Sequence, residues 1–458
     1  MYDVCIIGAG TAGIYAAYEL LKLKPALKVA VYEMGEDIYH RSCPIVAGKV
    51  KECISCKPCS IMSGFGGAGA FSDGKYNFTT QFGGWLGDYL PDRTVLDLID
   101  YVDSVNVSFG ATTETFSTDT PAAREIEKKA LEHDLHLLGA RCKHLGTERN
   151  LKILTNIYEY LKEKCDFFFK TEVTTITPTD AGYTLSFKKG GDVSCRYCVA
   201  APGRCGAEWF SDRCKELGLE MTNNQVDIGV RVELPARIFE HITSVVYESK
   251  LLYRTKLYGD TVRTFCMNPY GHVVSENVDG LITVNGHSYA DPALQSENTN
   301  FALLVSNRFT EPFKEPYTYG KHIASLSNML GGGIIVQRFG DLIRGKRTNE
   351  HRLSKSFTKP TLNATPGDLS LVLPKRHMDN IIDMIYALDK IAPGTANMDT
   401  LLYGVEVKFY SARIKLNNEL ETQAKGLYAV GDGAGITRGL AQAGASGVCA
   451  ARSIAQRI

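Results

Sequence analysis

The sequence predicts an α/β fold in which a nucleotide-binding part is interrupted by a second, mixed α/β part. Two observations predict it. The apolar run Val4 to Ile7 leads into Gly8-Ala9-Gly10-Thr11-Ala12-Gly13, and a second short strand, Val29 to Tyr32, ends at Glu33. Near the C-terminus, Leu427 to Val430 leads into Gly431-Asp432-Gly433-Ala434-Gly435. Because no nucleotide signature occurs between about residues 211 and 404, the nucleotide-binding part is expected to be split.

The N-terminal glycine motif is typical of a dinucleotide site. Glycine here permits a tight turn from strand to helix and lets backbone N–H groups approach a pyrophosphate. We expect Gly8, Gly10, Thr11, Ala12 and Gly13 to contact the cofactor. Glu33 follows Gly13 by 20 residues, and its carboxylate can accept hydrogen bonds from an unmodified adenosine ribose. A 2′-phosphate would be repelled there, so FAD or NAD fits and NADP does not.

Two later segments complete the pattern. The residues from Gly439 to Ala451 are mostly small, so a helix backbone could approach a flat ring closely, and Val199-Ala200-Ala201-Pro202-Gly203 forms another strand that ends in a turn. Together, these segments resemble the FAD-binding fold of the glutathione reductase type. The resemblance implies that Asp432 holds the ribityl chain, that the last helix faces the flavin pyrimidine, and that the Val173 backbone lies beside adenine. It also assigns cofactor contacts to Pro202, Gly203, Gly431, Gly435 and Gly439.

The predicted fold class is therefore α/β, with a Rossmann-like FAD-binding domain of this type interrupted by a mixed α/β cap domain. We expect residues 1–75 to form the first part of the FAD-binding domain, 76–210 a helical insertion and its second part, 211–404 the cap, and 405–458 the third part. No second G-x-G-x-x-G lies between a strand and a helix, so a separate nicotinamide domain is not expected.

Periodicity predicts the other elements. Helices are expected at 94–109, 121–133, 147–165, 300–309, 322–330 and 378–391, with Thr147 as an N-cap and Gly331-Gly332-Gly333 ending one helix. Strands are expected at 170–176, 183–187, 195–201 and 281–284. A further strand, Val226 to Glu233, alternates strictly and should be half-buried.

The segment from Ile61 to Lys75 makes the resemblance to a family more specific. Together with Val226 to Glu233, Thr264 to Gly271, Val284 to Tyr289 and Thr437-Arg438-Gly439, it resembles a family of uncharacterised FAD-dependent dehydrogenases, a kind of NAD(P)/FAD-dependent oxidoreductase, over essentially the whole chain. This resemblance implies a cofactor and a fold more than a reaction. It implies that a loop with Gly66, Gly67, Ala68 and Gly69 lies against the flavin, with Ser72, Asp73 and Lys75 near the ring, although Ser72-Asp73-Gly74 is equally compatible with a simple turn.

Composition excludes some classes of protein. Lys plus Arg and Asp plus Glu both total 51, so general attraction to nucleic acid or to an anionic membrane is not expected. No apolar stretch is long enough to span a bilayer, and the chain begins directly with a strand, so a cytoplasmic protein is expected. One basic cluster fits a solvated surface better than a site for an anionic substrate or an acidic electron-transfer partner. It contains Arg344, Lys346, Arg347, His351, Arg352, Lys355 and Lys359.

Thirteen cysteines are many for a cytosolic chain. Cys43, Cys53, Cys56 and Cys59 include two overlapping C-x-x-C steps. Cys53 and Cys56 could form a redox dithiol beside the flavin, the four thiolates could hold an iron–sulfur cluster or zinc, or all four could be inert. Cys195 and Cys198 share the C-x-x-C spacing but are expected to be small buried residues of a strand.

We therefore expect an FAD-dependent oxidoreductase that moves a hydride or electron pair between a small organic substrate and flavin N5. The candidate catalytic residues are Cys53, Cys56, Lys75 and His287, and Arg438 could meet the cofactor or an anionic substrate. The alternative is a thiol or iron–sulfur electron-transfer or redox-sensing flavoprotein with a protein partner as electron donor. A flavin monooxygenase is less favoured because hydroxylases of similar fold carry G-D-A-A-H in place of Gly431 to Gly435.

Overall fold

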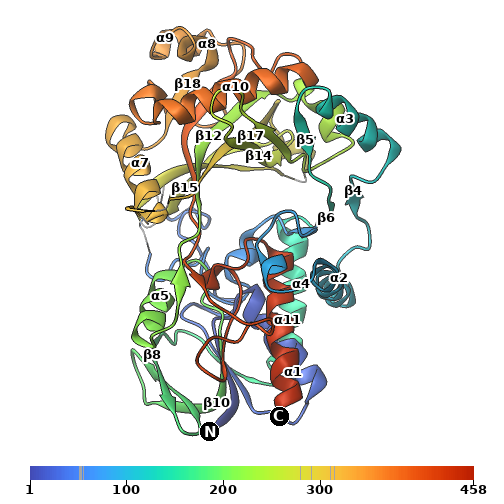
Figure 1. Ribbon diagram of the computed structural model, residues 1–458, viewed down its shortest axis with the longest axis vertical. Helices are drawn as coiled ribbons and strands as arrows, with labels where there is room; N and C mark the ends of the chain where they lie inside the picture. The colour runs from blue at the N-terminus through green and yellow to red at the C-terminus, as the bar shows by residue number, and fades with distance from the viewer. Residues whose placement is uncertain (51–53, 55, 279, 290, 310, 314) are drawn as a thin grey trace. The chain divides into compact units, whose positions relative to one another are not determined.

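The computed structural model describes residues 1–50, 54, 56–278, 280–289, 291–309, 311–313 and 315–458. The chain divides into two compact units. Unit 1 contains Met1–Thr115, Arg141–Asn224 and Tyr410–Ile458, and unit 2 contains Phe116–Ala140 and Gln225–Phe409. Both termini therefore belong to unit 1 (Figure 1). Residues 116–140, which we had placed in the helical insertion of the nucleotide-binding part, group with unit 2.

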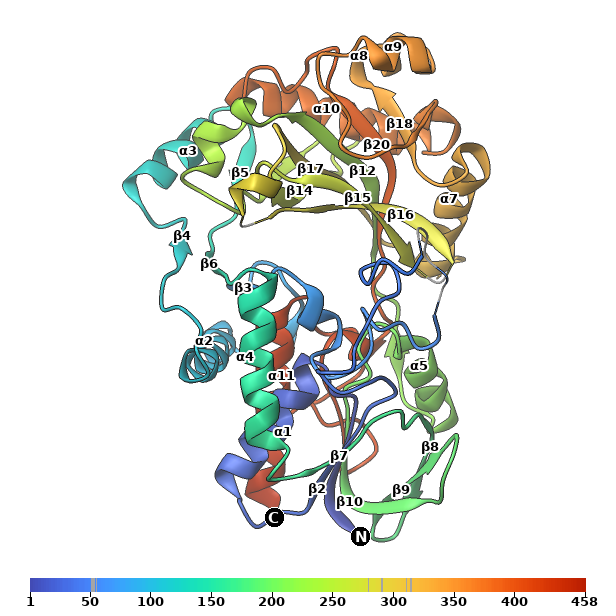
Figure 2. The same ribbon diagram turned by 180° about the vertical axis from the view of Figure 1, so that it is seen from behind.

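Unit 1 is built on a sheet with a parallel core. Its parallel strands are β7 (Asp166–Phe168), β2 (Val29–Tyr32), β1 (Tyr2–Ile7), β10 (Val193–Ala200) and β22 (Leu427–Ala429), in that spatial order. Counted along the chain this is the order 3-2-1-4-5 of a Rossmann-type sheet. The antiparallel hairpin of β8 (Val173–Thr179) and β9 (Gly182–Phe187) continues from the first half of β10 (Figure 2).

Helices α1 (Thr11–Leu23) and α11 (Leu440–Arg457) pack against each other in unit 1. Glycine makes this close approach possible, since a Cβ added at Gly447 would lie 2.1 Å from the carbonyl oxygen of Ala12. The small residues that we expected to admit a flat ring therefore also serve helix packing. The other elements of unit 1 are α2 (Asp92–Ser108), α4 (Thr147–Leu161), α5 (Ala207–Glu216), η1 (Gly67–Phe71), η2 (Leu86–Asp88), η6 (Asp432–Ala434), the pair β3 (Lys75–Phe78) and β6 (Arg141–His144), and the pair β11 (Met221–Thr222) and β21 (Arg413–Ile414).

Unit 2 is built on an eight-stranded sheet in which all neighbours are antiparallel except β18 and β19. In spatial order the strands are β19 (Thr365–Pro366), β18 (Ile335–Arg338), β20 (Leu401–Lys408), β12 (Val226–Pro235), β17 (Asn298–Asn307), β14 (Thr261–Asn268), β13 (Leu251–Arg254) and β5 (Leu135–Leu137). A separate hairpin joins β15 (His272–Val278) and β16 (Leu281–His287). The remaining elements are β4 (Phe116–Ser117), α3 (Pro121–Leu131), α6 (Glu240–Thr243), α7 (Pro316–Gly331), α8 (Phe339–Leu342), α9 (Glu350–Ser354), α10 (Lys375–Ile391), η3 (Ala236–Ile238), η4 (Pro292–Leu294) and η5 (Leu369–Leu371).

Helix α10 lies across one face of this sheet (Figure 1). The even-numbered residues of β12 from Val226 to Leu234 are apolar and join the core that α10 completes. The odd-numbered residues include Asp227, Arg231 and Glu233, which lie on the opposite face and are also buried. Our expectation of a half-buried strand was therefore wrong, because ion pairs and hydrogen bonds satisfy the polar face without water.

Two other expectations about local structure were also wrong. Residues 300–309 are not a helix, because residues 300–307 belong to β17. The apolar run of this central strand does not by itself distinguish a buried strand from a buried helix. Thr147 does not cap α4, since the N-cap is Gly146 with φ +78° and no side-chain cap bond from the described residues. The predicted helices near 94–109, 121–133, 147–165, 322–330 and 378–391 are confirmed as α2, α3, α4, α7 and α10, and Gly332 ends α7 in the left-handed conformation.

Candidate dinucleotide site

The glycines of the first motif are needed for close packing of the chain. Gly8 has φ +101°, and a Cβ there would lie 2.3 Å from the carbonyl oxygen of Ala201. A Cβ at Gly13 would lie 2.0 Å from the carbonyl oxygen of Gly8. The N–H of Ala201 also donates to the carbonyl of Ile7 over 2.8 Å. The first turn is thus fixed against the Ala201-Pro202-Gly203 turn.

Gly10 differs from its neighbours because it faces open space. A Cβ added there would find only the Cα of Gly67, at 3.9 Å. Gly10 is the N-cap of α1, and Gly439 is the N-cap of α11. Within the described part of the chain, no side chain caps either helix. Uncapped N-termini offer unsatisfied N–H groups and the positive end of a helix dipole, which suit the pyrophosphate and the electron-rich pyrimidine edge of FAD.

Glu33 is 6% exposed at the end of β2 and binds backbone N–H groups. Its Oε2 accepts from Ala9 over 2.8 Å, and its Oε1 accepts from Gly35 and Gly64 over 2.8 and 2.9 Å. An ionised carboxylate has about four acceptor positions, so one is left for a ribose hydroxyl. Glu33 also joins the glycine loop to the segment after residue 60, a role that the motif alone did not indicate.

The segment 60–71 lies directly against the glycine loop. The N–H of Gly66 donates to the carbonyl of Ala9 over 2.8 Å. A Cβ at Gly69 would lie 3.2 Å from Thr11 Oγ1 and 2.8 Å from the side chain of Leu440, so Gly69 sits between the first residues of α1 and α11. The loop of Gly66 to Gly69 thus lies at both helix N-termini.

Arg41 holds this segment in place, and sequence reasoning missed it. Its guanidinium donates to the carbonyls of Ser60, Ile61 and Phe65 over 2.6 to 3.0 Å and lies 4.7 Å from the ring centroid of Phe71. Burial lowers the pKa of Arg41 to about 10, which still leaves it charged near neutral pH. The sequence carries no signal for this role, because the partners are backbone carbonyls some 20 residues later.

The second glycine motif comes together with the Pro202-Gly203 turn. Gly431 and Gly435 have φ of +74° and +72°, and a Cβ at Gly433 would lie 2.6 Å from the carbonyl oxygen of Gly203. Asp432 accepts a hydrogen bond from the Thr437 hydroxyl over 2.7 Å, and its other oxygen lies 3.9 Å from Arg204 Nε. Its side chain keeps 22% exposure, so the carboxylate is accessible to a ligand.

Arg438 and Val173 lie near opposite ends of this site. The Arg438 guanidinium stacks 4.8 Å from the centroid of Tyr410, close to the start of α11. Val173 begins β8, two residues after Thr171, whose N–H donates to the carbonyl of Glu33 over 2.9 Å. The cofactor contacts predicted for both residues stay predictions.

Ser72, Asp73 and Lys75 follow this loop, and the structure adds His144 to them. Ser72 donates to the carbonyl of Gly69 over 2.8 Å and accepts from the N–H of Gly74 over 3.3 Å, so the simple turn is present. Asp73 Oδ2 lies 3.8 Å from Lys75 Nζ and 3.4 Å from His144 Nε2. His144 is 71 residues beyond Asp73, so only the pairing of β3 with β6 brings them together.

The cysteine hypotheses are only partly covered by the structure, because Cys53 lies outside the described residues. Cys43, Cys56 and Cys59 form no disulfides. Among the described residues, no three His, Cys, Asp or Glu side chains converge as ligands of a metal ion. The dithiol, iron–sulfur and zinc hypotheses that include Cys53 therefore stay predictions.

Cys195 and Cys198 are fully buried in β10, as expected of small core residues. Hydrogen bonding to Cys195, followed by burial, raises the pKa of Cys198 well above its ordinary value. That thiol is therefore protonated and unreactive at neutral pH.

In unit 2, His287 ends β16 and lies opposite His272 in the hairpin. Its ring meets Tyr289 edge to face with centroids 4.7 Å apart. His287 and Lys75 belong to different units, and the proposed catalytic role of each stays a prediction.

The polar face of β12 centres on Arg231, which is fully buried. Arg231 donates to both carboxylate oxygens of Glu406 over 2.8 and 3.0 Å and to Asn300 Oδ1 over 2.8 Å. Lys408 Nζ lies 2.9 Å from Glu406. These contacts saturate the charges, so we assign the network a structural role.

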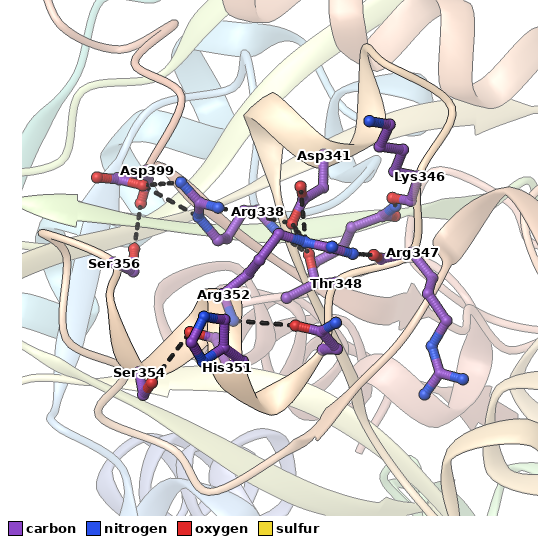
Figure 3. A network of polar contacts seen from close by, with 12 residues as sticks. Arg338, Asp341, Lys346, Arg347, Thr348, His351, Arg352, Ser354, Ser356 and Asp399 are labelled. Carbon is purple, nitrogen blue, oxygen red and sulfur yellow. Dashed lines mark hydrogen bonds and ion pairs between the residues drawn. The ribbon is translucent and has the colours of Figure 1, made fainter.

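The basic cluster lies in unit 2 on α9 and the loops around it (Figure 3). Buried Asp341 accepts from Thr348 and Arg352 over 2.7 and 3.2 Å and so fixes the loop. Every other basic residue of the cluster is exposed. This arrangement fits the solvated surface that the sequence favoured.

Part of unit 2 is similar to a known protein family. Residues 225–409 match the family described as FAD-dependent protein, C-terminal domain-like. The match and the dinucleotide site support FAD as the cofactor of this chain and a flavin-dependent oxidoreductase as its class. An uncharacterised protein of Clostridium beijerinckii is 27% identical over 474 aligned residues, which cover 99% of this chain and 80% of that protein.

Solved structures of similar shape are distant. A mutant FrdA of Escherichia coli quinol fumarate reductase is 13% identical with a TM-score of 0.40, over 100% of this chain and 70% of that one. The 2,6-dihydroxypyridine-3-hydroxylase of Arthrobacter nicotinovorans is 11% identical with a TM-score of 0.40, over 99% and 83%. The glycine oxidase of Bacillus cereus is 12% identical with a TM-score of 0.38, over 100% and 96%. These similarities are too distant to bear on the reaction.

Among the described residues, no helix combines the length and apolar character needed to cross a bilayer.

Proposed function

We propose that the chain is an FAD-dependent oxidoreductase that transfers a hydride or an electron pair between a small organic substrate and flavin N5. The observation that carries this proposal is the pair of uncapped helix N-termini, α1 and α11, with Gly69 between them. Glu33 stands at one end of this cradle and Asp432 at the other, so a long molecule with a ribose and a ribityl chain fits both.

The residues of unit 1 would hold the cofactor in named ways. The first N–H groups of α1 would bind the pyrophosphate, Glu33 would accept from the adenosine ribose, and Asp432 would accept from the ribityl chain. When bound, FAD supplies the carrier of two electrons. The chain would orient the reacting groups and exclude water. We infer that unit 1 is of the glutathione reductase type and that unit 2 is the cap that selects the substrate.

A second candidate is an electron-transfer flavoprotein that takes electrons from a protein donor through the cysteine segment. The observation that favours it is that the cysteine segment directly precedes, in the sequence, the residues 60–71 that line the cradle. Cys43, Cys56 and Cys59 are partly exposed, and Arg41 fixes the two ends of their segment by binding the carbonyls of Ser60 and Ile61. A flavin monooxygenase is a third possibility, but no contact among the described residues favours it.

Anaerobic purification followed by absorption spectroscopy and total iron and zinc analysis tests these functions together. Flavin bands with about one FAD per chain and reversible photoreduction support the proposal. Flavin bands with about four irons per chain favour the electron-transfer candidate. Oxygen consumption coupled to substrate hydroxylation favours a monooxygenase, and protein that binds no FAD contradicts all three.

A further inference from the structure

Three titratable side chains of unit 1 meet where β3 pairs with β6. Asp73 Oδ2 lies 3.4 Å from His144 Nε2 and 3.8 Å from Lys75 Nζ. Lys75 and His144 are direct cross-strand partners, so their side chains leave the same face of the ribbon. The exposed fractions of the Asp73, Lys75 and His144 side chains are 24%, 11% and 13%. An acid, a base and a lysine at partial burial can together hold and move a proton.

The backbone holds these side chains in place. The N–H of Gly146 donates to the carbonyl of Asp73 over 2.9 Å, and the N–H of Leu145 donates to the carbonyl of Gly74 over 3.2 Å. These two bonds therefore fix the turn at Asp73 against the residues that directly follow His144.

The other charged residues near this ribbon are paired elsewhere. Lys143 faces α2 and binds Asp103 over 2.8 Å, and Arg141 binds Asp100 of the same helix. Asp73 and Lys75 therefore lie beside His144 at the end of the ribbon, and both contribute to the local charge at His144.

The cluster follows a loop that contacts the start of α11, where the proposed cradle would hold the flavin ring. Asp73 follows η1 by two residues, and Gly69 of η1 lies against Leu440, the first residue of α11. Asn150 of α4 fixes this loop by donating to the carbonyl of Gly69 over 2.7 Å. Because Asp432 and α11 define the ribityl and ring end of the cradle and Glu33 the adenosine end, the cluster stands on the side where the reaction would occur.

We propose that His144 is the proton-transfer residue of this oxidoreductase, that Asp73 orients its ring, and that Lys75 stabilises negative charge that develops nearby. This inference rests on the proposed function and names its substrate class as a small quinone. Reduction of a quinone adds a hydride equivalent at one carbonyl oxygen and a proton at the other, so that both C=O groups become C–OH. His144 gives that proton from Nδ1 while Nε2 faces Asp73, and water then restores the proton to the imidazole. Oxidation of the hydroquinone runs through the same steps in reverse.

Paired variants test the proposal. His144→Gln and Asp73→Asn change the cluster. His40→Gln and Asp37→Asn change a matched His–carboxylate pair in unit 1, in which His40 Nδ1 lies 2.7 Å from Asp37 and His40 is 72% exposed. The first readout is the flavin midpoint potential of the holoprotein against pH, measured by spectroelectrochemistry. Because proton uptake at His144 would accompany reduction, we expect a bend in the wild-type curve that His40→Gln keeps and His144→Gln loses.

The second readout is the rate at which photoreduced protein is reoxidised by 1,4-naphthoquinone. We expect His144→Gln to slow it by about 100-fold at neutral pH, the usual contribution of a general acid. A His144→Gln protein that binds FAD and keeps both the wild-type curve and the wild-type rate overturns the inference while leaving the proposed function intact. If His144→Gln loses FAD, the midpoint potential of Asp73→Asn is measured against pH instead. A bend that moves to a different pH supports the inference, and a curve identical to that of the wild type overturns it. A wild-type protein that binds no FAD would instead overturn the proposed function itself.

Discussion

At the scale of single residues, two glycines of one motif have different physical roles. The Cβ of an alanine at position 10 would enter open space at the start of α1, whereas the Cβ of an alanine at position 13 would lie 2.0 Å from the Gly8 carbonyl oxygen. Gly10 also has φ −77°, which alanine adopts without strain. Gly10 therefore leaves room for a ligand, and Gly13 permits the fold.

We expect Gly10→Ala to fold normally and to lose at least about tenfold in FAD affinity, because its methyl group fills space beside the pyrophosphate donors. Gly13→Ala should instead lower the thermal stability or the soluble yield. Thermal denaturation of both variants and FAD titration of the apoproteins measure these effects. A Gly10→Ala protein that binds FAD with wild-type affinity would falsify our placement of the pyrophosphate.

A second prediction at this scale concerns His377, which is 5% exposed on α10. Neither ring nitrogen has a hydrogen-bond partner among the described residues, and burial lowers its pKa from 6.5 to about 4. Between these two pH values, His377 therefore binds a proton in the unfolded chain but not in the folded chain. The free energy of unfolding should fall as the pH drops from about 6.5 to about 4, by about 1.4 kcal/mol per pH unit from this residue.

Urea unfolding of the wild type and of His377→Leu at several pH values between 4 and 7.5 measures this contribution. We expect the variant to lose part of the acid sensitivity, whereas a control variant, His351→Gln at an exposed position of α9, keeps it. Equal pH dependence in all three proteins would contradict the assignment.

At the scale of elements, close helix packing stabilises unit 1 and a buried ion pair stabilises unit 2. In unit 1, Gly447 lets α11 approach α1, and Gly444 lies near Val102 of α2, where an added Cβ would meet that side chain at 3.0 Å. In unit 2, the ion pair between Arg231 of β12 and Glu406 of β20 joins neighbouring strands on a face from which water is excluded.

We expect Arg231→Met to destabilise the protein by about 3–5 kcal/mol, because it leaves the buried Glu406 carboxylate with Lys408 as its remaining cation. The matched control is Arg124→Met. Arg124 pairs with Asp119 on the surface of unit 2, with side chains 65% and 79% exposed, so its removal should change little. Urea unfolding measures both, and similar effects of the two substitutions would argue against a structural role for the buried pair.

At the scale of the whole molecule, the chemistry of the cysteine segment decides how electrons enter or leave. Replacing Cys53 and Cys56 with Ser should abolish turnover if they form a dithiol or bind a cluster. It should leave FAD content unchanged, since the predicted cofactor contacts include neither residue. Replacing Cys195 and Cys198 with Ala controls for the loss of two thiols and should leave turnover unchanged. Turnover that survives in the Cys53 and Cys56 double variant would show that the segment is dispensable.

The sequence predicted those features that depend on neighbouring residues or on a fixed spacing. The glycine turns, Glu33 at the end of β2, the small residues of α11 and most amphipathic helices follow from such local rules. The same rules do not distinguish a buried strand from a buried helix, so β17 was mistaken for a helix. The alternation of β12 predicted a half-buried strand, but its polar face is also buried because Glu406, 175 residues after Arg231, pairs with that arginine.

By itself, the sequence determined the dinucleotide motifs and the interrupted order of the nucleotide-binding part, because each is a short pattern with its own geometric requirement. Only the tertiary structure decided which distant side chains meet. It placed His144 beside Asp73, Arg41 on the carbonyls of residues 60–65, and Glu33 on the N–H of Gly64. These contacts join residues whose separation along the chain obeys no period, and strand pairing and loop packing set them.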